Sequence, residues 1–248
     1  MTDDSALVDE LLHCLREQRQ IDPITARAEG LSLGRAYRLS AAITEARGRA
    51  GEKVVGRKIG FTNRTIWNAF NVSSPIFGPI YDSTVARLGP QPFDTATLLE
   101  PRIEPEIAFR LAAPPEAGME PRDLIACISG ICAGFELVQS VFPGWKFEAA
   151  DTVAAFGLHG AFLHGPIREI APAERQNWVA SLADFATTLL RDGEVADVGH
   201  ARNVLGGGPL VALGHLADLV AELADATPLA EGEIITTGTL TQALPVGQ

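Results

Sequence analysis

Two glutamates one residue apart, Glu104 and Glu106, are the residues of this chain best placed to do chemistry. In an extended strand, residues two positions apart project to the same face, so the two carboxylates would point together. Like charges held beside an apolar core raise each other's pKa unless a cation lies between them. A hard divalent ion such as Mg2+ or Mn2+ meets that need. The alternative is a solvated strand face with two ordinary glutamates, although Pro105 between them favours an edge strand or a bulge, where sites often form.

Two more charged residues lie inside apolar runs. Glu136 sits in the middle of the run 133–138, and a charge in such a position is rarely left without a partner. As a third carboxylate it would complete a set of metal ligands with Glu104 and Glu106. Three such ligands leave positions open for water and for a substrate that binds through two oxygens, of which a 2-oxo acid is the simplest. Lys58, within 56–60, is either a surface lysine or a cation that meets a substrate carboxylate or moves protons.

Weaker signals mark five further residues. His159 has glycines close by on both sides and could approach a ligand closely, although a histidine in a turn is often only polar filling. Lys146 is either part of a site or a surface residue. Thr237, Gly238 and Thr239 place hydroxyls around a glycine just after a predicted strand, which suits a substrate carboxylate, although threonine is also a common strand residue. The chain has no Gly-x-Ser-x-Gly motif and no Cys/His nucleophile pair, so acyl-enzyme chemistry has no support.

The elements that must position these residues follow from the apolar pattern. A stripe of leucines three and four residues apart predicts a helix over 4–20, and Ser32 is a suitable N-cap for a second helix that runs to about residue 48. Short apolar runs punctuated by Gly and Pro then predict a β-rich core with inserted helices. The predicted strands are 53–61, 76–81, 103–109, 131–141, 161–163 and 234–237, the later helices are 64–70, 121–128 and 209–223, and a hairpin turn is predicted at 191–194.

Composition limits the class of protein. The 248 residues are 46% hydrophobic, which is enough for one large domain with a buried core. The net charge of -11 argues against a general binder of nucleic acid or of anionic membranes. The 3 cysteines show no metal-binding spacing and argue against a disulfide framework. Without an apolar run of about 18 residues or a basic and apolar leader, the sequence predicts a cytoplasmic protein with no transmembrane helix.

The order of several motifs along the chain is informative. They are Gly-Arg-Lys-Ile-Gly-Phe-Thr (56–62), Ser-Pro-Ile-Phe-Gly-Pro-Ile-Tyr (74–81), Arg-Ile-Glu-Pro-Glu-Ile-Ala-Phe (102–109), Phe-Glu-Leu-Val (135–138), Asp-Thr-Val-Ala (151–154) and Gly-Glu-Ile-Ile-Thr-Thr-Gly-Thr (232–239). In this order the chain, from about residue 30 onward, resembles the 2-keto-4-pentenoate hydratase and 4-oxalocrotonate decarboxylase group of the fumarylacetoacetate hydrolase superfamily.

The resemblance implies an α+β fold with a distorted β-roll core of the fumarylacetoacetate hydrolase type and an N-terminal helical part. Residues 1–52 would pack on a β-rich catalytic core of residues 53–248 to form one compact unit. The resemblance also implies a divalent cation and a homo-oligomer. It matches Glu104, Glu106 and Glu136 to the metal ligands of the group and Lys58 to its active-site lysine.

The chain departs from the group at positions that handle protons. After Glu136 the group usually carries Asp-x-Arg, where this chain has Gln-Ser-Val (139–141). After 151–154 the group continues with Asp-Asn-x-Ser, where this chain has Ala-Phe-Gly-Leu (155–158) followed by His159. His159 is therefore a candidate to replace the missing polar group. Ile76 stands where the hydratases commonly carry an acid, and this is closer to the decarboxylases.

We therefore expect a Mg2+- or Mn2+-dependent lyase that adds water to a 2-hydroxy-2,4-dienoate or its 2-oxo-enoate tautomer, as in aromatic-catabolic meta-cleavage pathways. Lys58 and His159 would be catalytic, while Lys146 and residues 237–239 would bind a small anionic 2-oxo acid. The first alternative is loss of CO2 from a 2-oxo diacid of the 4-oxalocrotonate type through the same metal enolate. C–C hydrolysis of an acylpyruvate would need a general base, and the sequence shows no His–Glu pair placed for it. A non-catalytic, oligomeric 2-oxo acid binding protein would keep the site without the chemistry.

Overall fold

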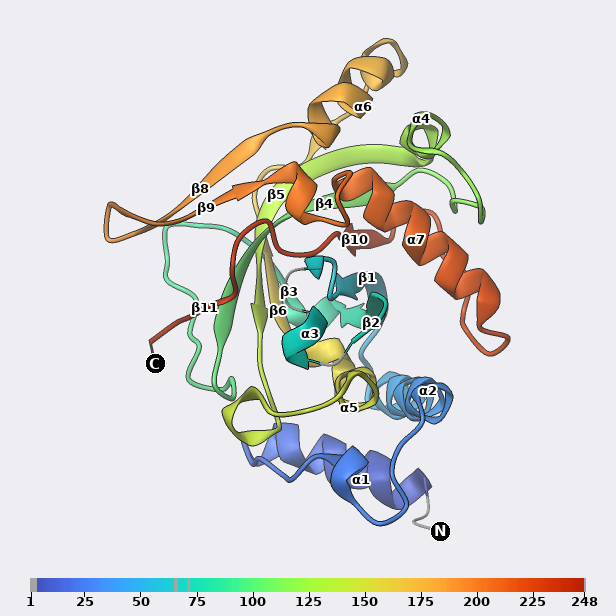
Figure 1. Ribbon diagram of the computed structural model, residues 1–248, viewed down its shortest axis with the longest axis vertical. Coiled ribbons are helices and arrows are strands. Elements are labelled where there is room, and N and C mark those ends of the chain that lie inside the picture. Colours follow the sequence, from blue (N-terminus) through green and yellow to red (C-terminus); the bar gives the residue numbers. More distant parts are fainter. Residues whose placement is uncertain (1–3, 65–66, 71, 248) are drawn as a thin grey trace.

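The structure is a computed structural model that describes residues 4–64, 67–70 and 72–247. Its main element is a curled mixed sheet with helices packed on both sides (Figure 1). The helices are α1 Asp4–Arg16, α2 Leu33–Arg49, α3 Trp67–Phe70, α4 Pro121–Leu124, α5 Ala149–Ala154, α6 Arg175–Ala183 and α7 Pro209–Glu222. The strands are β1 Val54–Gly60, β2 Ile76–Tyr81, β3 Val85–Arg87, β4 Arg102–Leu111, β5 Ile128–Val138, β6 His159–His164, β7 Arg168–Glu169, β8 Ala186–Arg191, β9 Glu194–His200, β10 Ile234–Thr236 and β11 Leu244–Pro245.

The nine-stranded sheet runs in the order β2-β1-β10-β4-β5-β6-β3, with β11 beside β4 and β7 beside β5. Only β1–β10 and β3–β6 among these neighbours are parallel, and the other pairs are antiparallel. All six predicted strands are present in this sheet, with ends displaced by up to three residues. The long pair β4–β5 lies at its centre, so the glutamate motif is part of the most extensively paired region of the molecule.

The expectation that Pro105 marks an edge or a bulge is wrong on the side of β4 that pairs with β5, and it holds on the other side. On the side of β5, Pro105 lies opposite Phe135 in unbroken register, and the one irregularity of this ladder falls at Arg110/Leu111. On the other side, β10 pairs with residues 108–110 and β11 with residues 102–103, which leaves a gap at Pro105. The carbonyl of Pro105 accepts a hydrogen bond from the Leu240 amide there. A proline is tolerated in this central strand because its missing N–H faces a loop rather than a ladder.

The helix α7 covers one face of the sheet. It begins with Pro209 at the first turn, as predicted, and buries a leucine stripe that includes Leu210, Leu213 and Leu216. This stripe packs with residues of α4, α6 and the sheet in the largest apolar cluster. The predicted helix over 121–128 is shorter in the structure, since α4 ends at Leu124, a 3-10 turn follows, and β5 begins at Ile128.

The N-terminal helices α1 and α2 pack against α5 in a second apolar cluster (Figure 1, bottom). α1 ends at Arg16, four residues before the predicted end, and α2 starts after the predicted N-cap Ser32, whose side chain accepts from the Arg35 amide. Buried Asp151 ties this region to the core, because its carboxylate accepts hydrogen bonds from the amide and hydroxyl of Thr25. Asp151 thus supports the fold and does not approach the carboxylate cluster through any recorded contact.

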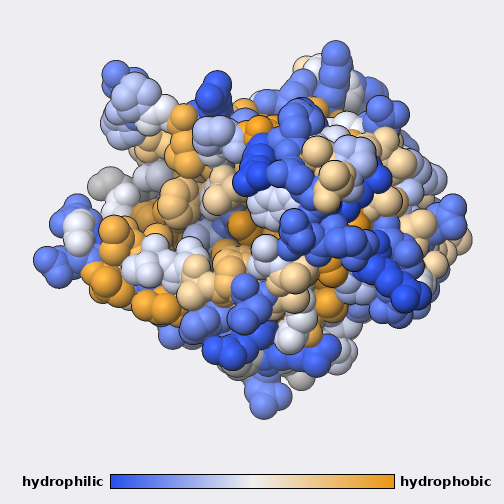
Figure 2. Space-filling view, turned by 90° about the horizontal axis from the view of Figure 1, so that it is seen from above, coloured by the Kyte–Doolittle hydropathy of each residue, from blue (hydrophilic) through white to orange (hydrophobic). Residues whose placement is uncertain are grey.

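The hairpin β8–β9 forms a separate two-stranded sheet around the predicted turn at 191–194. One of its faces packs on the C-terminal segment, where Asp197 accepts from the Gln242 amide and a side chain in place of Gly199 would collide with the Leu240 carbonyl. The other face exposes Leu190, Val195 and Val198. Figure 2 shows apolar side chains gathered toward the edge of the molecule where this hairpin projects.

Three smaller expectations can be compared with the described residues. The predicted helix over 64–70 is present as α3, while residues 65, 66 and 71 lie outside the described part. Cys14, Cys127 and Cys132 are buried free thiols. In the part of the chain that the structure describes, no helix combines the length and the apolar character needed to cross a membrane.

Candidate active site

The register of β4 and β5 brings three carboxylates together. Glu104 and Glu106 alternate onto one face of β4, and Glu104 lies directly opposite Glu136 on β5. Each of the three glutamates offers a carboxylate oxygen within 4.8 Å of the other two. Glu136 is fully buried and Glu106 almost so. The structure thus places the three sequence-predicted metal ligands in one cluster.

Lys58 reaches the same cluster from β1, which β10 separates from β4 in the sheet. Its Nζ lies 3.2 Å from Oε2 of Glu136, and its side chain is 4% exposed. The interpretation as a surface lysine is therefore wrong. The neighbouring Arg57 points to the other face of β1, where it pairs with Glu233. Gly157 makes room for Lys58, because a Cβ at this position, where φ is +61°, would lie 3.0 Å from the lysine Cδ.

Burial and mutual charge control the ionisation of the cluster. Burial raises the pKa of Glu104 to about 7, against the opposing attraction of Lys58. Burial, together with the charges of Glu136 and Glu104, raises the pKa of Glu106 well above its usual value. Burial also acts to raise the pKa of Glu136, but Lys58 and His159 outweigh it and lower that pKa. For Lys58 burial opposes the charged form, yet the three carboxylates outweigh it and raise its pKa.

The donor set fits a hard divalent cation. Among the described residues, Oε1 of Glu106 is buried and has no hydrogen-bond partner, while Oε2 accepts from the Gly238 amide at 2.7 Å. A single lysine cannot neutralise three carboxylates of which two are buried, and an uncompensated buried charge is costly. An ion bound by three carboxylate oxygens would satisfy the free oxygen of Glu106 and remove the repulsion.

His159 holds Glu136 through a hydrogen bond. Its Nδ1 lies 2.9 Å from Oε1 of Glu136, and its Nε2 lies 2.9 Å from the hydroxyl of Thr84. The structure thus contains a His–Glu pair that the sequence did not reveal, although neither residue belongs to the described lining of the cavity, where a general base for acylpyruvate hydrolysis would be needed. The histidine is buried and does not belong to the described lining of the cavity. It contacts Glu136, a candidate metal ligand, and not the cavity in which a substrate would bind. Thr84 was not foreseen, and no signal in its surroundings identifies it.

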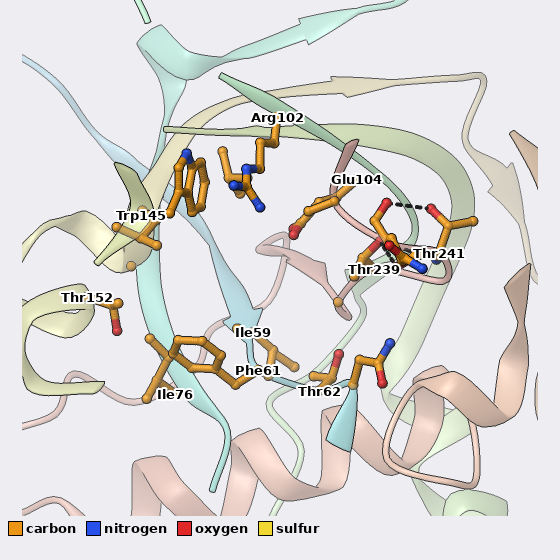
Figure 3. Close-up of a pocket in the computed structure, with 18 of the residues that line it drawn as sticks. Ile59, Phe61, Thr62, Ile76, Arg102, Glu104, Trp145, Thr152, Thr239 and Thr241 are labelled. Atoms are coloured by element: carbon orange, nitrogen blue, oxygen red, sulfur yellow. Dashed lines mark hydrogen bonds between the residues drawn. The ribbon is translucent and has the colours of Figure 1, made fainter. Parts of the chain in front are cut away.

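A cavity of about 320 Å³ opens beside the carboxylate cluster (Figure 3). Glu104 reaches it from β4, and Thr62, Asn63, Gly238 and Thr239 line the same end. Apolar side chains form much of the remaining wall: Ile59, Phe61, Ile76, Val138, Trp145, Phe147 and Leu158. The cavity is therefore suited to a small molecule with a polar end and an apolar chain.

The predicted substrate-binding residues divide into two groups. Gly238 and Thr239 line the cavity. The hydroxyl of Thr237 instead donates to the Ile107 carbonyl at 2.8 Å, away from the described lining. Lys146 is exposed and also lies outside it. Just before it the chain makes a 3-10 turn with positive φ at Trp145, and the tryptophan lines the cavity instead.

Sequence reasoning also missed Arg102 and Thr62. Both line the cavity, and Figure 3 shows Arg102 beside Glu104, from the same strand. Strand alternation was a sufficient signal for Arg102, since it stands two residues before Glu104 and therefore shares its face. Thr62 belongs to the motif 56–62, but its place at the cavity depends on the chain that follows β1.

No known family model matches the chain. It is 32% identical over 248 residues to a 2-keto-4-pentenoate hydratase from Burkholderia vietnamiensis, covering 97% of this chain and 89% of that protein. It is 31% identical over 242 residues to a 2-hydroxyhexa-2,4-dienoate hydratase from Comamonas testosteroni, covering 95% and 86%. Among solved structures, the chain is similar to 4-oxalocrotonate decarboxylase from Pseudomonas putida G7, complexed with magnesium and adipate. The superposition has a TM-score of 0.88 at 28% sequence identity, and it covers 98% of this chain and 89% of the decarboxylase chain. The expected α+β fold with its curled core is confirmed.

Proposed function

The chain belongs to the family of 2-keto-4-pentenoate hydratases and 4-oxalocrotonate decarboxylases, and from this premise we propose that it is a divalent-metal-dependent lyase that adds water to a 2-hydroxy-2,4-dienoate or its 2-oxo-enoate tautomer. The observation that carries the proposal is the cluster of three glutamates, two of them buried and Glu104 at the cavity wall, with Lys58 beside them. Hydratases acting on such compounds and a decarboxylase are among its relatives, which supports a place in aromatic catabolism.

We assign Glu104, Glu106 and Glu136 as the ligands of a Mg2+ or Mn2+ ion. When bound, the ion supplies positive charge that orients the carboxylate and 2-oxo groups of the substrate and stabilises negative charge on them. The Gly238 amide fixes one oxygen of Glu106, and His159 fixes one oxygen of Glu136. These contacts preorganise the ligands, which is the role of groups behind a metal site.

Lys58 is the group proposed to move protons. Its ammonium sits at the cluster and is shielded from solvent, so it can deliver a proton to the substrate carbon chain during ketonisation and accept one again as water adds. His159 was the second candidate for this task. Both of its ring nitrogens are engaged, one by Glu136 and the other by Thr84, so we assign it to positioning Glu136.

Decarboxylation is the second candidate reaction, and two observations favour it. Ile76, at the position where hydratases commonly carry an acid, lines the cavity. The fold also superposes closely on a decarboxylase. The same metal site would then stabilise the charge left when CO2 departs, and no water would be added. Homo-oligomeric assembly and a cytoplasmic location stay predictions.

Product analysis tests the proposal. The purified protein, stripped of metal with EDTA and then supplied with Mg2+, should convert 2-hydroxypenta-2,4-dienoate to a 4-hydroxy-2-oxo acid, followed by loss of the dienoate absorbance and by NMR of the product. Glu106→Gln should abolish turnover, whereas Glu45→Gln, at an exposed glutamate of α2, should leave it unchanged. Release of CO2 from a 2-oxo-enedioate with no hydroxylated product would assign the chain to decarboxylation. Metal-dependent binding without any turnover would identify a binding protein.

A further inference from the structure

The connection between β9 and α7 binds two walls of the active-site cavity, although none of its residues belongs to the described lining. It begins with a 3-10 turn, Ala201–Asn203. The amide of Leu205 donates to the Thr62 carbonyl at 2.9 Å, and Leu205 has a φ of +50°, which a non-glycine residue adopts only where the surrounding structure enforces it. The side-chain amide of Asn203 donates to the Leu240 carbonyl at 2.8 Å. One short connection thus reaches both the chain that follows β1 and the chain that follows β10.

The hydrogen bond from Asn203 meets the centre of a turn that lines the cavity. Thr239 and Thr241 belong to the described lining, whereas Leu240 between them packs in the largest apolar cluster. The hydroxyl of Thr239 donates to the Thr241 carbonyl at 3.0 Å and accepts from the Thr241 amide at 3.3 Å (Figure 3). Because these bonds close the turn on itself, a contact that fixes the Leu240 carbonyl also fixes both threonines.

The Leu240 carbonyl depends on Asn203 for its hydrogen bond. Leu240 is 3% exposed, and its amide donates to the Pro105 carbonyl at 2.9 Å. β9 approaches the Leu240 carbonyl oxygen so closely that a Cβ on Gly199 would lie 2.2 Å from it. Within the described part of the chain, no other group donates a hydrogen bond to this carbonyl. Removal of the Asn203 donor would therefore leave a buried carbonyl without a partner, and this favours a displaced turn.

The two walls meet next to the glutamates. Thr62 lines the cavity, and its hydroxyl is buried without a hydrogen-bond partner among the described residues. A Cβ on Gly238 would lie 1.8 Å from this hydroxyl, so the walls are in contact here. The Gly238 amide in turn donates to Glu106 at 2.7 Å. The connection after β9 therefore sets the space available to a group that binds at the three carboxylates and accepts from Thr62.

We propose that Asn203 is a positioning residue, which holds the turn 239–241 against Thr62 and so shapes the end of the cavity that receives the carboxylate and 2-oxo groups. Asn203 is half-buried and acts through the Leu240 carbonyl. A displaced turn weakens binding at this end of the cavity, while Lys58 and the three glutamates keep their places on their strands. This inference rests on the proposed function, because it needs a 2-oxo acid at the glutamates, and it holds whether water is added or CO2 is lost.

Oxalate tests this assignment, because it is an unreactive chelator that has two carboxylates and no carbon chain. Its affinity for the protein at saturating Mg2+ is measured by calorimetry, beside the steady-state kinetics with 2-hydroxypenta-2,4-dienoate. Asn203→Leu and Asn203→Ala, which both remove the donor, should weaken oxalate binding and raise KM by about tenfold, with kcat within about threefold of the wild type. Asn203→Ser keeps a hydroxyl donor and should recover part of the loss. Asn177→Leu, at an exposed asparagine of α6, is the matched control and should change neither quantity.

A merely structural role of Asn203 predicts a different result. Unchanged oxalate affinity and KM in Asn203→Leu and Asn203→Ala, with only a lower melting temperature, would overturn the positioning role and leave the metal site and the lyase in place. Loss of Mg2+ affinity by the same factor as oxalate affinity would also overturn it, because the effect would then pass through Glu106. A wild-type protein that neither binds oxalate with Mg2+ nor turns over would overturn the proposed function, and this inference with it. Far-ultraviolet circular dichroism that matches the wild type establishes that each variant is folded.

Discussion

A substitution of Lys58 should affect the catalytic rate without weakening metal binding. It is the cation at a cluster of three carboxylates, but as an ammonium it cannot itself coordinate a metal. Replacement by the similarly shaped Met should therefore lower kcat by about 10²- to 10⁴-fold, the range for loss of a positioned acid or base. Mg2+ affinity should be retained or increased, because a competing positive charge has been removed.

Steady-state kinetics together with calorimetric Mg2+ titration check this prediction. Lys53→Met, an exposed lysine just before β1, is the control and should change neither quantity. A Lys58→Met variant that turns over normally would show that the proton comes from elsewhere. Loss of Mg2+ binding together with activity would show that Lys58 only supports the structure of the cluster.

The raised pKa of Glu104, about 7, predicts a pH-dependent affinity for the metal. A metal ligand must be deprotonated, so below pH 7 the ion has to displace a proton from Glu104, whereas above pH 7 the carboxylate is already formed. The Mg2+ affinity should therefore fall as pH decreases from 8 to 5.5, by about tenfold per pH unit below 7 for the proton on Glu104 and more steeply where Glu106, whose pKa is also raised, must lose a proton too. Calorimetry in buffers of different ionisation enthalpy measures both the affinity and the protons released. An affinity that is flat across this range would contradict the shifted pKa.

At the scale of elements, β6 supports β5 at the metal site. The pairing of these strands places His159 next to Glu136, and the 3-10 turn after β2 supplies Thr84 on its other side. His159→Phe removes the hydrogen bond to Glu136 and should weaken Mg2+ binding by about 10- to 100-fold, as is typical for groups behind a metal ligand. His159→Gln, which can still donate, should recover part of the affinity.

His164→Phe on the same strand is the matched control for this prediction. That histidine is bound to its own neighbour, the Gly165 carbonyl, and has no recorded contact with the cluster. A loss of thermal stability in the His159 variants without a change in Mg2+ affinity would contradict a positioning role and leave only a packing role. The Mg2+ titration therefore distinguishes the two, because packing alone does not move it.

The regular alternation of side chains along a strand decides which parts of the site could be predicted from the sequence. Strand alternation sufficed to place Glu104 and Glu106 together, and the same rule places Arg102 beside them. The tolerance of Pro105 in a central strand depends on where the loop between β10 and β11 runs, some 130 residues away, and alternation carries no information about it. The contact of His159 depends on a register shift at Leu137/Val138 in the β5–β6 ladder. The position of Lys146 relative to the cavity could not be predicted, because residues in an irregular turn have no fixed period.

At the scale of the whole molecule, the hairpin β8–β9 carries a stripe of exposed apolar side chains. Leu190, Val195 and Val198 are 56%, 63% and 50% exposed and lie on one face, opposite the face that packs on the C-terminal segment. A two-stranded sheet is only marginally stable on its own, and an exposed apolar stripe on a projecting hairpin is typical of a surface that another protein covers. Because the family resemblance implies a homo-oligomer, we expect a second copy of this chain to cover the stripe.

Replacing these three residues by Thr should convert the oligomer into a monomer. Each apolar side chain contributes about 1.5–3 kcal/mol when fully buried, so loss of all three removes a large share of the association energy of a contact, while Thr keeps the strand propensity of the hairpin. Light scattering coupled to gel filtration should give a multiple of 26.3 kDa for the wild-type protein and a single chain for the triple variant. Leu88→Thr, at another exposed aliphatic residue, should leave the mass unchanged. A wild-type protein that elutes as a monomer would contradict the prediction outright, and an unchanged mass of the triple variant would place the contact between copies on a different surface.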